Sequence, residues 1–329
     1  MGFGPKLFQF HKKETQYTLR LIPLGGYCMM LSEDDEENEN DENSFEKKSI
    51  WARMAVVLAG PAMNFVIAFL FSMVIIHFCG SDPAIIGAVY NKDNIEKYQI
   101  ENAEEYFNGV YPAEEAGISD GDRVLKIEGS TVKNFRELQI YLQIYGDGSP
   151  IDLTLEKEDG TVYDTTVHPA KTPDGYKIGI MSVGYQLPKN FGELCKYSAY
   201  ETRYWVKATF LSLKLIVTRQ VSSDEVSGPV GVAKNMNDTF NEAAKSSVLD
   251  LFLNWMNYIV LLSANLGVMN LLPIPGLDGG RFIFLLIEAV TRKKVPKDKE
   301  NIVTLIGFVL VMLLMVVILF NDIKNVFFH

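Results

Sequence analysis

The sequence predicts a polytopic α-helical membrane protein with an inserted extracytoplasmic α+β domain and an N-terminal membrane-associated β-hairpin. Three observations lead to this fold class. Residues 54–78, 251–277 and 302–320 contain no Asp, Glu, Lys or Arg, and a helix needs only ~20 apolar residues to cross ~30 Å of hydrocarbon. Residues 81–187 have mixed charge and regular turn signals, which are typical of a folded domain in water. Residues 3–31 are rich in β-forming residues and are interrupted by a pair of glycines.

The N-terminal region divides into a hairpin and an acidic loop. Residues 1–32, which include QYTLRLIPLGGYCMML, form the predicted hairpin, with Gly25 and Gly26 breaking the β-rich run. Residues 33–48 contain EDDEENENDENSFE, an acidic run that supplies much of the net charge of −10. Low hydrophobicity and high charge predict a solvated, disordered loop. Nothing in the composition suggests a nucleic-acid partner, and we expect none.

The charges flanking the apolar runs predict the topology. We assign three transmembrane helices, 51–78, 250–291 and 300–320. The loop between the last two, RKKVPKDK (292–299), carries five Lys or Arg in eight residues, and Arg53 marks the start of the first span. The positive-inside rule places both in the cytoplasm. The stretch between the first and second spans then lies outside, and so does the C-terminus.

Residues 190–248 are predicted to be an amphipathic extracytoplasmic linker. The topology requires that residues 205–218 do not cross the membrane. Arg203, Lys207 and Lys214 are spaced so that all three share one helical face. This spacing favours a helix that lies on the membrane surface.

Residues 81–187 carry a readable order of elements. PAIIGAVY is a predicted strand, PAEEAGI a short helix, and DGDRVLKIEG a turn and strand. Asn134 is placed to cap the helix FRELQIYLQIY, and Asp159-Gly160 to turn the hairpin IDLTLEKEDGTVYDTTVHP. This pattern resembles a bacterial PDZ domain. PDZ domains bind extended peptides by adding a strand to a sheet edge.

The stretch NLLPIPGLDGGR (270–281) places one carboxylate in apolar surroundings. A carboxylate near the bilayer interior costs about 2.5–3.5 kcal/mol on insertion scales, so Asp278 is expected to have a partner or a function. From the residues alone, helix capping and metal binding are equally good interpretations. Pro273 and Pro275 remove two backbone donors and interrupt the helix. Gly279 and Gly280 allow a tight backbone turn.

Six segments in order carry a family resemblance: GFGP (2–5), IPLGGY (22–27), AGPAMNF (59–65), the PDZ-like domain, SGPVGVAK (227–234) and NLGVMNLLPIPGLDGG (265–280). With them the chain resembles the site-2-protease-type intramembrane zinc metalloproteases, of the branch of the regulator-of-sigma-E protease. The family holds zinc with two histidines of an H-E-x-x-H helix and the aspartate of the last motif, and the glutamate is the general base. The resemblance therefore implies a Zn²⁺ cofactor with Asp278 as a ligand.

The resemblance also implies substrate-positioning residues: Asn270, Pro273, Pro275, Gly279 and Asn64. Asn270 would hold the substrate or the developing oxyanion. The prolines would leave carbonyls facing the cleft. Asn64 is expected either to hydrogen-bond between helices or to support the cleft next to Asp278, and both roles are favoured over a catalytic one.

The sequence departs from the family at the catalytic helix. It has no H-E-x-x-H, and no two of its histidines, His11, His77, His168 and His329, are four residues apart. No catalytic residue is therefore assigned, and one of three expected zinc ligands is present. In the family the missing helix immediately precedes the segment that reads GFGPKL here. We expect that this span was lost or that the true start lies upstream of Met1.

The predicted function is that of an intramembrane zinc metalloendopeptidase in a bacterial inner or plasma membrane. Its substrate would be a single-span membrane protein such as an anti-sigma factor or a signal-peptide remnant, with a peptide bound at the PDZ-like domain. The printed chain is expected to be inactive. The alternative is a non-catalytic, membrane-anchored PDZ-like adaptor. The segment QYTLRLIPL either pairs with an extended substrate or only closes the cytoplasmic mouth.

Overall fold

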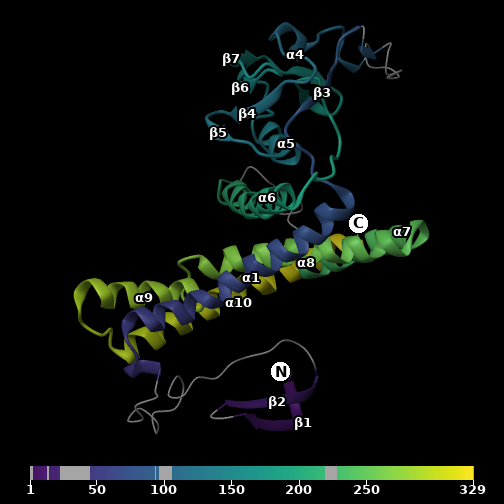
Figure 1. Cartoon of the computed structure of the whole chain (residues 1–329). Helices are drawn as coiled ribbons and strands as arrows, with labels where there is room; N and C mark the ends of the chain where they lie inside the picture. The colour runs from purple at the N-terminus through teal and green to yellow at the C-terminus, as the bar shows by residue number, and fades with distance from the viewer. Residues whose placement is uncertain are drawn as a thin grey trace.

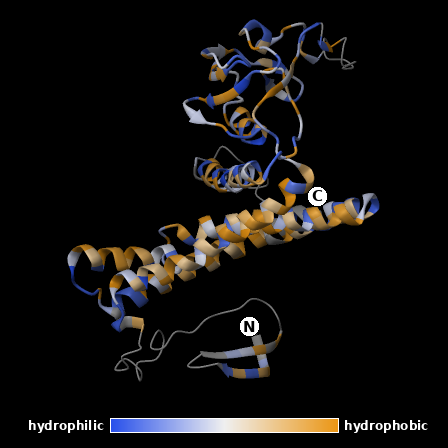
Figure 2. Ribbon diagram, in the orientation of Figure 1, coloured by the Kyte–Doolittle hydropathy of each residue, from blue (hydrophilic) through white to orange (hydrophobic). Residues whose placement is uncertain are grey.

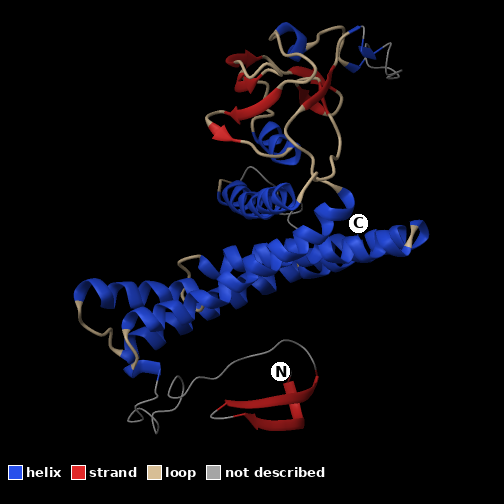
Figure 3. Ribbon diagram, in the orientation of Figure 1, coloured by secondary structure: helices blue, strands red, loops and turns tan. Residues whose placement is uncertain are grey.

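The computed structural model separates the chain into a hairpin, a helical bundle and an inserted domain (Figure 1). It describes residues 3–12, 15–22, 45–92, 94–95, 106–218 and 228–328. The acidic run at 33–44 and the Gly25-Gly26 pair lie outside the described residues. Figure 3 shows the strands gathered in the hairpin and the inserted domain, while the remainder is helical.

The N-terminal hairpin pairs β1 (Phe3–Lys12) with β2 (Thr15–Ile22). The strands are antiparallel, and Lys12 pairs with Thr15, so the chain reverses direction between these two residues. The rings of Phe10 and Tyr17 stack with centroids 4.9 Å apart. Six large apolar side chains of this hairpin are exposed: Leu7, Phe8, Phe10, Tyr17, Leu19 and Leu21.

The bundle contains three helices long and apolar enough to cross a membrane among the described residues. They are α1 (Ile50–Cys79), α8 (Val248–Leu271) and most of α10 (Lys297–Phe328), whose apolar stretch is Asp298–Asn321. Ser49 caps α1 by accepting a hydrogen bond from the Ala52 amide at 3.3 Å. Figure 2 shows the apolar residues concentrated along these helices. Since their outward-facing apolar side chains cannot be left in water, this is a membrane-integral protein.

Helices α8 and α9 (Asp278–Thr291) together run antiparallel along α1. Ala68 of α1 is buried with Val260 and Ala264 of α8, and Met54 and Val57 of α1 are buried with Leu285 of α9. The predicted second span, 250–291, is therefore two helices in one line, with a break at 272–277. The break falls where two prolines remove backbone donors.

The inserted domain follows directly from α1. Its strands are β3 (Ile86–Val89), β4 (Arg123–Ile127), β5 (Ser130–Thr131), β6 (Ile151–Glu156), β7 (Val162–Val167), β8 (Ala170–Thr172), β9 (Gly175–Lys177) and β10 (Ile180–Ser182). Its helices are α4 (Pro112–Glu115) and α5 (Phe135–Ile144). The main sheet has the order β5-β4-β6-β7, β10 pairs with β3, and β8 pairs with β9, all antiparallel.

Helix α5 begins where the sequence predicts a cap. The Asn134 side chain accepts a hydrogen bond from the Glu137 amide at 2.9 Å, and Glu137 in return accepts one from the Lys133 amide at 2.7 Å. This reciprocal pair satisfies backbone donors at the start of the helix. Leu138 of α5 is fully buried against Leu153 and Leu155 of β6 in the core of the domain.

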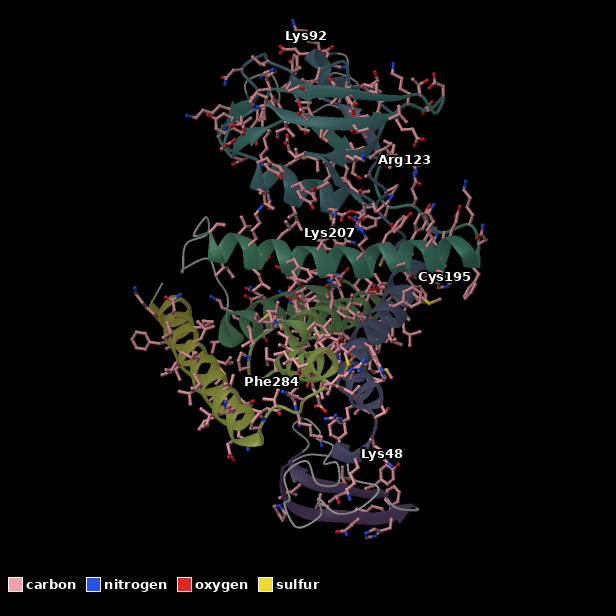
Figure 4. The ribbon with its side chains drawn as sticks, turned by 90° about the vertical axis from the view of Figure 1, so that its left-hand side faces the viewer. Lys48, Lys92, Arg123, Cys195, Lys207 and Phe284 are labelled. Atoms are coloured by element: carbon pink, nitrogen blue, oxygen red, sulfur yellow. The ribbon has the colours of Figure 1, made fainter. Side chains whose placement is uncertain are left out.

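Helix α6 (Phe191–Val217) lies between the inserted domain and the bundle (Figures 1 and 4). It is longer than the predicted amphipathic segment, 205–218, because Asn190 caps a helix that starts at Phe191. Helix α7 (Pro229–Ser246) follows and packs on α8, where the rings of Phe240 and Trp255 stack 4.3 Å apart.

Candidate functional site

The segment between α8 and α9 is a compact turn held by its own backbone. The Leu272 amide bonds to the Met269 carbonyl at 3.1 Å, and the Ile274 amide bonds to the Leu272 carbonyl at 2.7 Å. The Leu277 amide closes the turn onto the Ile274 carbonyl at 3.1 Å. Gly276 has a φ of +95°, a conformation that side chains rarely adopt. The turn brings α9 back against the end of α8.

Three glycines allow this close approach. A Cβ on Gly279 would collide with the carbonyl of Leu272, and a Cβ on Gly280 would lie 2.5 Å from the Ile274 carbonyl oxygen. A Cβ on Gly307 of α10 would collide with the Pro275 carbonyl. The two glycines predicted to let the backbone turn therefore lie where two helix ends meet, and a third packs α10 against the same turn.

Asp278 is the first residue of α9, and its carboxylate faces α1. A Cβ on Gly60 would lie 3.4 Å from the Asp278 Oδ2 atom. Pro61 follows and is buried, and Asn64 lies one helical turn beyond Gly60 on the same face. The structure thus brings the AGPAMNF segment of α1 to Asp278, although the two are more than 200 residues apart.

The site lies within the apolar length of α1. Gly60 is ten residues beyond Ile50, which at 1.5 Å per residue is about 15 Å from the start of the helix. His77 is seventeen residues beyond Gly60, or about 26 Å along the axis. Since Zn–N bonds are about 2.0–2.1 Å long, His77 and Asp278 cannot bind one metal ion.

Asn270 is in the last turn of α8, one turn before the break, and is partly buried. Gly267 of the same helix lies against α1, since a Cβ there would be 2.8 Å from the Phe65 ring. Pro273 and Pro275 lie inside the turn itself. The five residues predicted to position a substrate are therefore on the turn or on the helix segments that flank it.

A buried ion pair, which the sequence reasoning missed, fixes the other end of α9. The Arg53 guanidinium donates to both Glu288 carboxylate oxygens, at 2.6 and 3.1 Å. The side chains are 9% and 15% exposed. The signal in the sequence was an arginine inside the first span, together with Glu288 as the one acidic residue of α9 after Asp278. Helix α9 thus contacts α1 at both ends, near Gly60 and at Arg53.

The described residues do not complete a zinc site. Asp278 offers an oxygen ligand of a type that zinc accepts, but a catalytic zinc site takes three protein ligands. Within the described ranges no group of three His, Cys, Asp or Glu residues comes together. His11 is on β1 and His168 is in the inserted domain, while His329 lies outside the described residues. No catalytic step through a metal follows from these residues alone.

A second site is a groove in the inserted domain, with a volume of about 540 Å³. Helix α5 contributes Phe135, Gln139, Leu142 and Gln143 to its lining, and residues 178–180 also line it. Strand β10 starts at Ile180, and in the described part of the chain β3 is its only sheet neighbour. The groove therefore runs between a helix and a strand edge, and the sequence had not identified its lining residues.

Comparison with known proteins identifies the family of this chain. Peptidase family M50 matches residues 1–314. A Clostridium acetobutylicum relative is 35% identical over 325 residues, covering 98% of this chain and 87% of the relative. The zinc metalloprotease RasP of Geobacillus kaustophilus is 31% identical over 405 residues, with 99% and 90% covered. The regulator of sigma-W protease RasP of Bacillus subtilis is 28% identical over 408 residues, with the same coverage. The chain therefore belongs to peptidase family M50, the site-2-protease family of zinc metalloendopeptidases.

Proposed function

We propose that this protein acts in intramembrane proteolysis of single-span membrane proteins, with Asp278 as a zinc ligand. The observation that carries this proposal is the position of Asp278 at the start of α9, against Gly60 of a helix that crosses the membrane. A carboxylate in apolar surroundings is costly and usually has a function. It is also placed on α9, a helix that packs against α1, and a packed helix holds a ligand more precisely than a loop does.

The other two ligands and the general base are those of an H-E-x-x-H helix. The sequence has no such motif. A single carboxylate does not hold zinc as a three-ligand site does. We therefore expect these 329 residues, taken alone, to bind zinc weakly and to cleave nothing.

Five residues would position the substrate next to this ligand. Asn270 would donate to the substrate carbonyl or the developing oxyanion. Pro273 and Pro275 leave carbonyls without intrahelical donors, which suits an extended substrate segment. Gly279 permits the close approach of α9 to the end of α8 next to Asp278, and Asn64 would support the cleft or join helices from α1.

The groove of the inserted domain would bind an extended peptide as a PDZ domain does, by adding a strand to β10. Its lining combines apolar and aromatic side chains, such as Phe107, Phe135 and Ile180, with polar ones, such as Gln139 and Asp174. The basic residues at the start of α1 and between α9 and α10 support an extracytoplasmic position for this domain in a bacterial plasma membrane.

The substrate class follows from the membrane setting. The Bacillus subtilis relative is named as a regulator of sigma-W protease. By analogy, the proposed substrate here is an anti-sigma factor with one membrane span. A signal-peptide remnant, which is also a single membrane-spanning segment, is the second proposed substrate. Strand β2 either pairs with this substrate or closes the cytoplasmic mouth. A proline scan of residues 17–21 that leaves cleavage intact would exclude pairing.

The test is a fusion that supplies the missing ligands. An apolar helix with H-E-x-x-H is joined before Gly2, and zinc content and cleavage of a single-span reporter are measured. We expect about one zinc per fused chain, lost together with cleavage in Asp278→Ala. The matched control is Asp250→Asn, which changes a partly exposed aspartate of α8, and it is expected to retain both.

Two outcomes contradict the proposal. If the fused Asp278→Ala chain keeps its zinc, Asp278 is not a ligand. If the unfused chain holds one tightly bound zinc that Asp278→Ala removes, the expectation of weak binding is wrong. A fused chain that binds peptide but neither binds zinc nor cleaves the reporter supports the alternative, a non-catalytic membrane-anchored adaptor. The groove of the inserted domain is the feature that favours this alternative.

A further inference from the structure

Six charged side chains meet where the inserted domain rests on α6. We name this group the clamp; its members are Asp82, Arg136, Glu137, Glu201, Arg203 and Lys207. Arg136 and Glu137 begin α5, the last three belong to α6, and Asp82 follows the end of α1. Three acids thus face three bases. Figure 4 shows Lys207 at the level where α6 meets the inserted domain.

The first half of the clamp is centred on Arg136. Its Nε lies 3.3 Å from the Asp82 Oδ2 atom, and its terminal nitrogen donates to Glu201. The Asp82 and Glu201 side chains are 6% and 3% exposed. The Tyr204 ring lies 4.8 Å from the guanidinium carbon, and the Trp205 indole donates to Glu201 at 3.0 Å. Arg136 therefore joins the exit of α1, the start of α5 and the middle of α6.

The second half is centred on Glu137, whose side chain is 2% exposed. Arg203 donates to both of its carboxylate oxygens at 2.9 Å, and the Lys207 Nζ lies 2.8 Å from one of them. Both bases also donate to the Thr131 carbonyl, at 3.1 and 2.6 Å. Two cations from α6 thus close onto one buried carboxylate of α5.

These charges favour one arrangement of the two helices. Removing charges from water is costly, and the cost is offset only while each charge keeps its partner in good geometry. If α5 tilted or slid on α6, charges such as Glu137 and Glu201 would lose partners before reaching water. A contact made of apolar side chains alone would tolerate such sliding more readily, because hydrophobic association is non-directional.

Helix α6 is itself fixed to the membrane helices. Trp205 packs against the buried cluster of Ala68, Val260 and Ala264. Thr209, one turn further along, donates to the Asn265 side chain of α8. One face of α6 therefore binds the inserted domain through the clamp. Another face packs on α1 and α8, the two helices that flank the Asp278 site.

Four other residues of α5 line the groove: Phe135, Gln139, Leu142 and Gln143. We propose that the clamp residues are positioning residues that hold this groove in one fixed orientation above α1 and α8, the membrane helices that flank the Asp278 site. The role in substrate delivery rests on the proposed function of the groove. A peptide bound there enters the site from a set direction, and the domain does not swing freely on a linker.

The test measures the distance between the domain and the bundle by pulsed electron spin resonance. Spin labels are placed at Val162 of β7 and Leu70 of α1, both exposed, in a background with Cys28, Cys79 and Cys195 replaced by serine. The protein is held in lipid nanodiscs. We expect one narrow distance distribution for the parent, and loss of that single narrow peak in Arg203→Gln/Lys207→Gln and in Arg136→Gln. The α6 control Lys214→Gln keeps the narrow peak.

Peptide binding is measured on the same variants by fluorescence anisotropy with a library of labelled peptides. We expect unchanged affinity, since the groove face of α5 carries none of the clamp residues. As a folding safeguard, the conservative variant Arg203→Lys, which keeps a cation able to donate to Glu137, is expected to keep the narrow peak. A broad distribution in the parent, or a narrow one in both clamp variants, would overturn the inference. Absence of peptide binding with a narrow distribution would instead reject only the function of the groove.

Discussion

The Arg53–Glu288 ion pair gives a sharp prediction about what holds α9 in place. Replacing Glu288 with Gln leaves the Arg53 guanidinium facing one acceptor oxygen and an amide NH₂ group instead of a carboxylate. The Nε of Arg53 is already buried without a hydrogen-bond partner in the described part of the chain. The substitution therefore leaves a buried cation without its counter-charge.

The structure sets the magnitude. Both side chains are largely buried, and the pair is bidentate at 2.6 and 3.1 Å. Breaking such a pair from one side costs about 3–5 kcal/mol, and the retained oxygen of Gln places Glu288→Gln near the lower figure. A loss of about 3 kcal/mol raises the equilibrium constant for unfolding by roughly a hundredfold, since about 1.4 kcal/mol corresponds to each factor of ten. Glu288→Ala is expected to lose more.

The assay is the free energy of unfolding in mixed micelles titrated with SDS. The matched control is Arg123→Gln, which breaks an exposed pair with Glu156 at 3.9 Å and should cost under about 1 kcal/mol. The double variant Arg53→Met/Glu288→Leu should recover most of the loss, because two apolar side chains leave no buried charge. The reasoning would be refuted if the free energy of unfolding of Glu288→Gln lay within about 0.5 kcal/mol of the parent's. It would also be refuted if the losses of Arg53→Met and Glu288→Leu, measured singly, simply added up in the double variant.

Three further predictions follow from other contacts. Gly280→Ala should displace α9 from the turn at 272–277, because its Cβ would lie 2.5 Å from the Ile274 carbonyl oxygen. Gly60→Ala meets only an ordinary 3.4 Å contact, so thermal melts in detergent should separate the two variants. Asn134→Ala should destabilise the protein by about 0.5–2 kcal/mol through loss of the α5 cap, read by chemical denaturation, and an unchanged midpoint would contradict the capping role. Burial raises the pKa of Glu201, an effect that Arg136 partly offsets, so the folded state binds this proton more tightly than the unfolded chain and stability should fall as pH rises from the ordinary to the raised pKa. Glu201→Gln should flatten that dependence in melts across the same pH range, and an identical slope would exclude Glu201 as its source.

The sequence predicts the features that arise from local physics. Uncharged runs of sufficient length predict the three apolar helices, and the third of them is the clearest at 302–320. Pro273 and Pro275 predict a break that the structure places between Leu271 and Asp278. Asn134 predicts the start of α5 because an Asn side chain satisfies free amides at that position.

The remaining features depend on contacts between distant segments. Arg53 and Glu288 are 235 residues apart, and no local pattern pairs them. Arg203 and Lys207 were interpreted as the polar face of a helix on the membrane surface. In the structure they bind Glu137 of the inserted domain, while Lys214 remains exposed. A pattern of charges on one helix face shows that the face is polar, but it does not distinguish water from an acidic partner.

The contacts of α9 explain why Asp278 is on a helix and not in the turn before it. The turn at 272–277 is closed by its own backbone hydrogen bonds, so it links α8 to α9 without including Asp278. Gly279 and Gly280 then place the first turn of α9 against the end of α8, and Arg53 fixes the last turn to α1. A carboxylate on this helix can shift only if one of these contacts is lost. A metal ligand needs such restraint, since its position must be held to within about 0.5 Å of the productive geometry.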